Sequence, residues 1–158
     1  MSEHELLMTL RESKLLKGLL EEDLAMISSF GRRLVFQKNA TLIREGQVDP
    51  SLYVVIKGQM EVVLPKEGGV HGLVRATRIK LNHLVQGDFI GEYALIDREP
   101  ASASVIAVEP CEVFEITQSD FDKILNSSDR LAKTIYRNML QVTIKRVRDS
   151  NKELDICF

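Results

Sequence analysis

The chain has 158 residues, of which 44% are hydrophobic and 28% charged, and this composition suits one globular domain with a buried core. Lysines and arginines number 21 against 23 acids, so a formal charge of −2 gives the molecule no general attraction for nucleic acid. The charged N-terminal stretch MSEHELLMTLRESK has no apolar core of the kind that secretion signals need. No window approaches the roughly 18 apolar residues of a membrane helix. We therefore expect a cytoplasmic protein without membrane insertion.

Residues 1–30 form the first of three segments, and their pattern is helical. Apolar residues recur at spacings of three and four, namely at Leu6, Leu7, Leu10, Leu20, Leu24 and Ile27. Gly18 interrupts the pattern, and three acids follow at 21–23, where negative charge suits the positive end of a helix dipole. We expect a break near Gly18 and a helix start at these acids.

Residues 31–118 change to a β pattern. Short runs rich in Val, Ile, Phe and Tyr are separated by Gly and Pro: LVFQ, TLIRE, SLYVVIKG, QMEVVLP, TRIKLNHLV, ASVIAV and CEVFEIT. Many short strands with frequent turns are typical of a sandwich or barrel. The fold class predicted is therefore mainly β, a double-stranded β-helix or cupin-like jelly roll.

Residues 119–158 return to a helical pattern, with a long helix from about Leu131. Six basic residues and no acid lie between Arg130 and Arg148. This charge indicates a solvated face first, and recognition of an acidic partner or a membrane surface second. The apolar residues of this helix fall on two opposite arcs, Leu131, Ile135, Met139 and Val142 on one and Tyr136, Leu140, Ile144 and Val147 on the other. Since a surface helix normally buries one stripe, we expect one arc to pack on the β-roll and the other to meet a partner.

The stretch GEYALIDREPASAS, residues 91–104, resembles the phosphate-binding cassette of the cyclic-nucleotide-binding domain family, which includes catabolite activator protein and the regulatory subunits of cyclic-AMP-dependent protein kinase. The stretches IREGQ at 43–47, LYVVIKGQMEV at 52–62 and QGDFIGE at 86–92 are similar to the β-roll turns of that family. The resemblance implies a ligand site made by Gly91, Glu92, Tyr93, Ala94, Ala101, Ser102, Ala103 and Ser104. It also implies that Glu92 accepts a hydrogen bond from a ribose 2′-hydroxyl.

The chemistry of these residue types agrees with such a site. Gly91 permits backbone torsions and a close approach that a side chain would block. Residues 93–96 can form one helical turn with free N–H groups, which Pro100 then ends. Ser102 and Ser104 can donate to a ligand, or they can satisfy backbone groups of their own loop.

The sequence departs from the family pattern at Ala101, where the resemblance implies an arginine that pairs with the cyclic phosphate. Truncating one partner of a buried charge pair costs roughly 2–5 kcal/mol, which is about a hundred- to a thousand-fold in affinity. The nearby charges are mostly acidic, because Glu92, Asp97 and Glu99 outnumber Arg98. We therefore expect weak or altered binding of cyclic AMP and cyclic GMP.

Two substitutions for the missing cation are conceivable, and a third possibility is a ligand with another shape or less negative charge. Arg98 could serve as a substitute cation, or a basic residue of the TRIK strand (Arg75, Arg78 or Lys80) could reach the site. An enzyme is not expected, since no nucleophile and base are paired and the three histidines, His4, His71 and His83, do not cluster as in metal-dependent cupins. His83 is interpreted as a core or interface histidine. The cysteines, Cys111 and Cys157, match no metal spacing, and no cofactor is expected.

The leading hypothesis is a stand-alone, non-enzymatic regulatory module that passes a signal to a downstream protein. The alternative is a ligand-free scaffold for dimerisation or docking. The resemblance further implies a homodimer through the C-terminal helix, which we assign to Leu131, Ile135, Met139 and Val142. No nucleic-acid partner is expected, because transcription factors of the family carry a helix-turn-helix domain after the long helix and this chain ends at Phe158.

Overall fold

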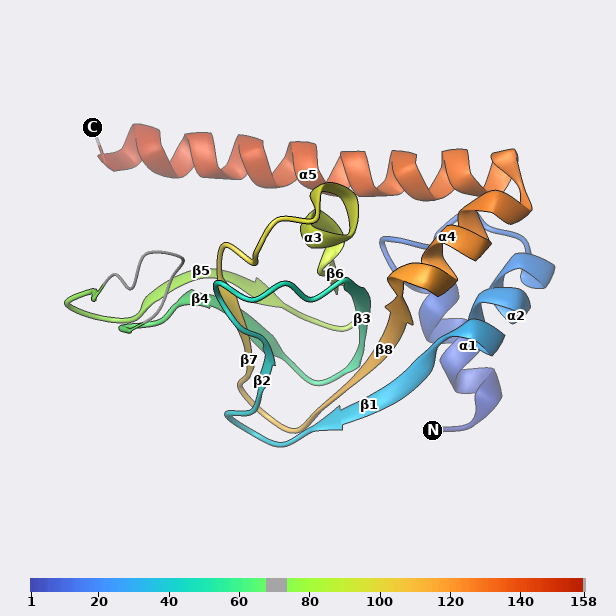
Figure 1. The fold of residues 1–158 in the computed structure, drawn as a ribbon, viewed down its shortest axis with the longest axis horizontal. Coiled ribbons are helices and arrows are strands. Elements are labelled where there is room, and N and C mark those ends of the chain that lie inside the picture. The colour runs from blue at the N-terminus through green and yellow to red at the C-terminus, as the bar shows by residue number, and fades with distance from the viewer. Residues whose placement is uncertain (68–73, 158) are drawn as a thin grey trace.

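The computed structural model describes residues 1–67 and 74–157, and it shows two four-stranded antiparallel sheets flanked by helices (Figure 1). This architecture confirms the predicted fold class. The helices are α1 (Glu3–Glu12), α2 (Glu21–Phe30), α3 (Glu92–Asp97), α4 (Gln118–Ser127) and α5 (Asp129–Cys157). The strands are β1 (Arg32–Phe36), β2 (Thr41–Ile43), β3 (Ser51–Lys57), β4 (Met60–Leu64), β5 (Ile79–Leu84), β6 (Phe89–Ile90), β7 (Ser104–Ala107) and β8 (Cys111–Thr117).

The two sheets have the strand orders β1-β8-β3-β6 and β2-β7-β4-β5. Strand β3 explains how the molecule holds two cores at once. Its side chains alternate between the two faces of the first sheet, so Tyr53 and Val55 join the core between the sheets. Leu52, Val54 and Ile56 join the core between that sheet and the helices. Because both faces of β3 are buried, its sequence contains the continuous apolar run LYVVI, residues 52–56.

The helical segments begin where the sequence predicts. Helix α2 starts at Glu21, and the Asp23 carboxylate accepts a hydrogen bond from the Leu20 backbone N–H at 3.1 Å. Helix α5 has 29 residues and runs along the top of the molecule, passing above α3 (Figure 1). Within the described residues, no helix combines the length and the low polarity that crossing a membrane requires.

The rotation of α5 corrects one prediction. Leu131, Ile135 and Met139 are buried in the helix-facing core of their own chain, and Val142 packs against it. The assignment of this arc to a dimer interface is therefore wrong, since a partner cannot reach side chains that the same protomer covers. The outward arc is the other one, with Tyr136, Leu140, Ile144 and Val147 between 42% and 60% exposed.

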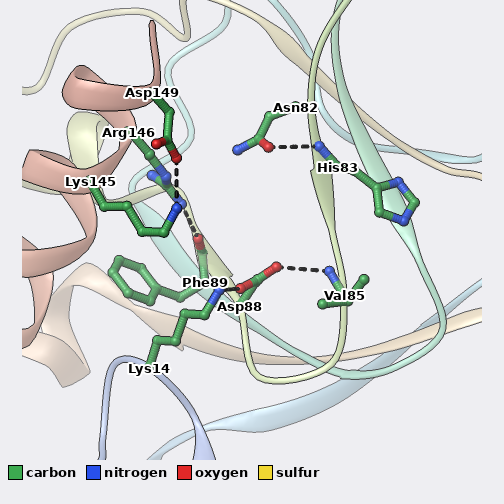
Figure 2. Close-up of polar contacts among 9 residues, drawn as sticks. All are labelled: Lys14, Asn82, His83, Val85, Asp88, Phe89, Lys145, Arg146 and Asp149. Carbon is green, nitrogen blue, oxygen red and sulfur yellow. Dashed lines mark hydrogen bonds and ion pairs between the residues drawn. The ribbon is translucent and has the colours of Figure 1, made fainter. Parts of the chain in front are cut away.

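Strand β5 corrects a second prediction. It is an edge strand whose first five residues are exposed, and His83 is one of them. Figure 2 shows the His83 imidazole lying apart from the Lys14–Asp88 ion pair and from Arg146. His83 is therefore not a core histidine. His4 is also exposed, and His71 lies outside the described residues.

Candidate functional site

A cavity of about 250 Å³ lies between the second sheet and the segment that carries α3. Its apolar wall consists of Ile43, Val62, Ile90 and Val105, which belong to strands of both sheets. The opposite wall is the cassette, residues 91–104. The volume of the cavity falls just below the range of about 300–1,000 Å³ that is typical of small-molecule pockets. Seven of the eight predicted ligand residues line it, namely Gly91, Glu92, Tyr93, Ala94, Ala101, Ser102 and Ala103.

Gly91 sets the entry into α3. Its φ is +96°, a left-handed conformation that side chains rarely adopt, and a Cβ there would lie 2.3 Å from the Ser51 carbonyl oxygen. This close approach brings the start of α3 against β3. The prediction that only glycine suits this position agrees with the geometry.

Ala101 lies where the cassette meets the turn at residues 44–47. Its carbonyl accepts from the Gly46 N–H at 2.8 Å, and its own N–H donates to the Gln47 carbonyl at 2.9 Å. The residue is partly buried against the core between the sheets and lines the cavity. The backbone of the cassette is therefore held in place, while the side chain at this position is a methyl group.

Ser104 is the predicted ligand residue that does not line the cavity. It is buried, and its hydroxyl accepts a hydrogen bond from the Glu45 backbone N–H at 2.9 Å. This contact favours the interpretation that the hydroxyl satisfies a loop backbone group. Ser102 is exposed and borders the cavity.

The charged side chains among the described lining residues of the cavity are all acidic. Four carboxyl groups line it, those of Asp49, Glu92, Asp97 and Glu99, and none of the described lining residues is basic. Asp49 accepts from the Tyr53 hydroxyl at 2.7 Å, and burial together with this bond raises the Tyr53 pKa. The described lining of the cavity therefore combines an apolar wall with acidic side chains.

The cations considered as substitutes are elsewhere. Arg98 is exposed, is not among the lining residues, and ends α3 in a left-handed conformation at φ 65°. Arg75 donates to both carboxylate oxygens of Glu45, at 3.2 and 2.9 Å. Arg78 and Lys80 both pair with Glu61, at 2.7 and 2.8 Å.

Glu92 is held from outside the cassette, by Arg146 of α5. An Arg146 nitrogen lies 2.5 Å from Glu92 Oε1, and another donates to the Phe89 carbonyl at 3.0 Å. Figure 2 shows Arg146 reaching from α5 to Phe89, whose ring lies 5.7 Å from the guanidinium. Asp88, which directly precedes Phe89, forms an ion pair with Lys14. The sequence pattern placed Arg146 only among the basic residues of the long helix, and no local signal connects it to Glu92.

The second carboxylate oxygen of Glu92 has no hydrogen-bond donor among the described residues. Glu92 is 4% exposed, and Oε2 accepts no hydrogen bond from the described residues. Burial raises the pKa of this carboxyl group, and the charge of Arg146 opposes the shift. A hydrogen-bond donor on a bound molecule would satisfy this oxygen.

A second cavity of about 390 Å³ separates α3 from α5. Tyr93, Ile96 and Asp97 form one side, and Tyr136, Met139, Leu140 and Thr143 form the other. Glu92 and Tyr93 border both cavities. Glu92 and Tyr93 therefore connect the cassette cavity to the cavity that α5 lines.

Among the residues that the structure describes, no three His, Cys, Asp or Glu side chains cluster in a way that could hold a metal ion. Cys111 is a free, buried thiol, and its Sγ lies 3.0 Å from the carbonyl oxygens of Gln59 and Glu109. Burial raises its pKa, which keeps the thiol protonated and unreactive at neutral pH.

Comparison with known proteins places this architecture in a family. Residues 33–128 match the family model of the cyclic nucleotide-binding domain. The chain is 32% identical over 116 residues to the cAMP-activated global transcriptional regulator CRP of Salmonella typhimurium, and the match covers 71% of this chain and 52% of that protein. It is 28% identical over 147 residues to Glutaminase 1 of Bradyrhizobium diazoefficiens, covering 93% of this chain and 22% of that protein.

The solved structures agree on the fold. A cyclic nucleotide-binding domain from Methylobacillus flagellatus superimposes with a TM-score of 0.81 at 20% identity, covering 98% of this chain and 83% of that one. The chain spans about half the length of the CRP that it matches. On the matched residues, the two sheets and the cassette, the chain belongs to the cyclic nucleotide-binding domain family.

Proposed function

We propose that this domain is a non-enzymatic sensor whose cavity binds cyclic AMP and cyclic GMP weakly and accepts a less negatively charged ligand. The observation that carries the proposal is the charge of the cavity, which has four lining carboxyl groups, one of them (Glu92) paired with Arg146 of α5, and no lining cation among the described residues. A cyclic phosphate placed against Ala101 would meet a methyl group. Because the site is partly enclosed, the missing charge-assisted bonds are costly.

The chemistry of the cavity supports a particular kind of ligand. Its apolar wall favours a molecule with a flat or aliphatic body. Glu92 Oε2 is buried without a donor, which favours a hydroxyl or amine group on that molecule. An uncharged or cationic compound with such a donor would fit this combination.

The proposed signal travels through the ion pair between Glu92 and Arg146. A ligand that engages Glu92 competes with Arg146 or reinforces it, and in either case it binds one position of α5 better than another. Only such a difference in affinity can shift the population of α5. The cavity between α3 and α5 leaves space for this movement.

A homodimer through α5 belongs to the same proposal. Leu140, Ile144 and Val147 are 60%, 51% and 55% exposed and lie on one face of the helix. An apolar stripe of this kind is typical of a helix that meets a partner helix. A dimer would bring the two cassettes under a shared pair of helices.

Thermal unfolding with and without ligand tests the proposal. A ligand present at a hundred times its dissociation constant stabilises a protein by about 2.7 kcal/mol. We expect cyclic AMP, cyclic GMP and cyclic dinucleotides at about 0.1 mM to stabilise by less than about 0.5 kcal/mol. A stabilisation near the larger value would contradict weak binding. If a panel of uncharged and cationic amphipathic compounds also gave no shift, the domain would be a scaffold that retains only the fold.

A further inference from the structure

A second feature of α5 lies at the opposite end from Arg146. An open groove of about 590 Å³ lies between the first part of α5 and the loop before α2. Four of its lining residues are cationic, Lys17, Arg130, Lys133 and Arg137, and none of its described lining residues is acidic. We call this feature the basic groove. Its charge is opposite to that of the cassette cavity, in a molecule whose formal charge is −2.

The groove is a built structure and not a chance meeting of long side chains. Asn138 of α5 is 6% exposed, and its amide nitrogen donates to the carbonyl oxygens of Leu15 and Lys17 at 2.7 and 2.9 Å. These bonds fix the loop against the helix. Gly18 follows in a left-handed conformation at φ +86°, which turns the chain beside Thr134.

Three of the four cations are available to a partner. Arg130 donates to both carboxylate oxygens of Asp23, at 3.0 and 2.7 Å, so this pair is neutral. Lys17, Lys133 and Arg137 are exposed and have no acidic partner among the described residues. The groove therefore presents about three uncompensated positive charges on a short surface.

The shape of the groove indicates the class of partner. The α5 residues that line it run from Arg130 to Gln141 at helical spacing, a distance of about 16 Å along the axis. A single small anion would leave most of this length unused. Nucleic acid is disfavoured, since binding it typically neutralises about six to ten phosphates and the chain as a whole is acidic. A membrane surface is disfavoured because the described lining residues include no large apolar side chain to insert.

We propose that the basic groove binds a short acidic segment of a partner protein. Carboxylates spaced by about one helical turn would meet Lys133 and Arg137, which are four residues apart, while Lys17 contacts the segment from the other side. Thr134 and Gln141 also line the groove, and the Gln141 amide can bond to a peptide backbone, while the Thr134 hydroxyl, which donates to the Arg130 carbonyl at 3.0 Å, can still accept a hydrogen bond. This inference does not depend on which ligand occupies the cassette cavity. It does place both contacts on one rigid helix, which gives a signal from Arg146 a route to the partner.

Fluorescence anisotropy with a labelled probe tests the groove. The probe is a synthetic helical peptide of about twelve residues with glutamates spaced by three and four, and the matched control peptide carries glutamine in their place. The protein variant is Lys133→Gln/Arg137→Gln. Its control is Arg148→Gln/Lys152→Gln, which removes the same charge at the same spacing from the exposed end of α5. Equal thermal midpoints for the two variants would establish that both fold.

We expect the glutamate peptide to bind at low salt and to bind the groove variant about five- to tenfold more weakly, because the variant loses two exposed ion pairs with the peptide. The control variant should stay within about twofold of the wild type. Amide chemical shifts should change at Gly18, Thr134 and Asn138. The proposal is overturned if the glutamate peptide does not bind, if the glutamine peptide binds equally, or if both variants lose the same affinity. It is also overturned if duplex DNA, anionic vesicles, or inorganic phosphate at matched ionic strength displaces the peptide from the groove.

Discussion

Arg146 and Glu92 are 54 positions apart in the sequence, and their side chains meet at 2.5 Å. The contact joins α5 to the first residue of α3, and through it to the wall of the cassette cavity. Glu92 is 5% and Arg146 22% exposed in their side chains, so the ion pair is shielded from water. Mutation of each partner can measure how much this ion pair contributes to the free energy of unfolding.

Arg146→Met should destabilise the domain strongly. Removing one partner of a buried ion pair costs about 3–5 kcal/mol, since the other charge remains without compensation. Urea unfolding measures this loss. Lys145→Met is the control, because Lys145 is 75% exposed and its ion pair among the described residues is with Asp149 on its own helix, and it should change stability by less than about 0.5 kcal/mol.

The double variant Arg146→Met/Glu92→Gln should recover part of the stability that Arg146→Met loses. With a neutral amide at position 92, no buried charge is left unpaired. A double variant as unstable as the sum of the two single variants would show that the ion pair does not couple the helices.

The raised pKa of Glu92 predicts a pH dependence with a definite sign. A carboxyl group whose pKa is higher in the folded state binds more protons folded than unfolded, so its contribution to stability decreases as the pH rises through the folded pKa. Glu92→Gln removes this contribution. The stability of the variant relative to the wild type should therefore rise between about pH 4.5 and neutrality. Paired urea titrations across this range measure the difference, and a difference that falls with pH would contradict the direction of the shift.

Asn138 should be essential to the loop that forms the basic groove. Asn138→Ala removes two hydrogen bonds and leaves the carbonyl groups of Leu15 and Lys17 without a donor, at a cost of about 2–3 kcal/mol. Gln141→Ala, one helical turn closer to the C-terminus and exposed, should change stability by less than about 0.5 kcal/mol. Equal effects of the two substitutions in urea unfolding would contradict the role given to Asn138.

The outward arc of α5 predicts where a dimer interface can be disrupted. Leu140→Glu places a charge on a side chain that is 60% exposed in one protomer, so it should dissociate a dimer without unfolding the chain. Ile135→Glu places the same charge in the core, where Ile135 is 1% exposed, and should unfold it. Sedimentation at tens of micromolar distinguishes these outcomes. A wild-type chain that is monomeric at that concentration would contradict the proposed dimer.

The sequence allowed the sheets to be predicted because their signals are local. Strands such as β3 and β8 are short β-branched runs bounded by turn residues, and the cassette carries its motif in consecutive positions. The orientation of α5 could not be obtained in this way. Its two apolar arcs are both periodic, and only packing against the helix-facing core, to which Phe121 of α4 belongs, decides which arc faces inward.

Some charges of the site could likewise be predicted from the sequence, and others depend on the tertiary fold. The absence of arginine at position 101 is visible in the sequence, and so are the acids around it. That Arg75 is already paired with Glu45, and that Arg146 reaches Glu92, depends on the tertiary fold. The basic groove likewise combines Lys17 with residues more than a hundred positions later, which no sequence window contains.

The central claim is that the cavity lacks the cation that a cyclic phosphate needs, and calorimetric titration of cyclic AMP into Ala101→Arg tests it most directly. Ala101→Gln serves as the control, since it adds a long polar side chain without charge. We expect the arginine variant to bind at least about tenfold more tightly than the wild type, about 1.4 kcal/mol or more, and the glutamine variant to gain little. Tight binding of cyclic AMP by the wild type, or an arginine variant with unchanged affinity, would contradict the claim.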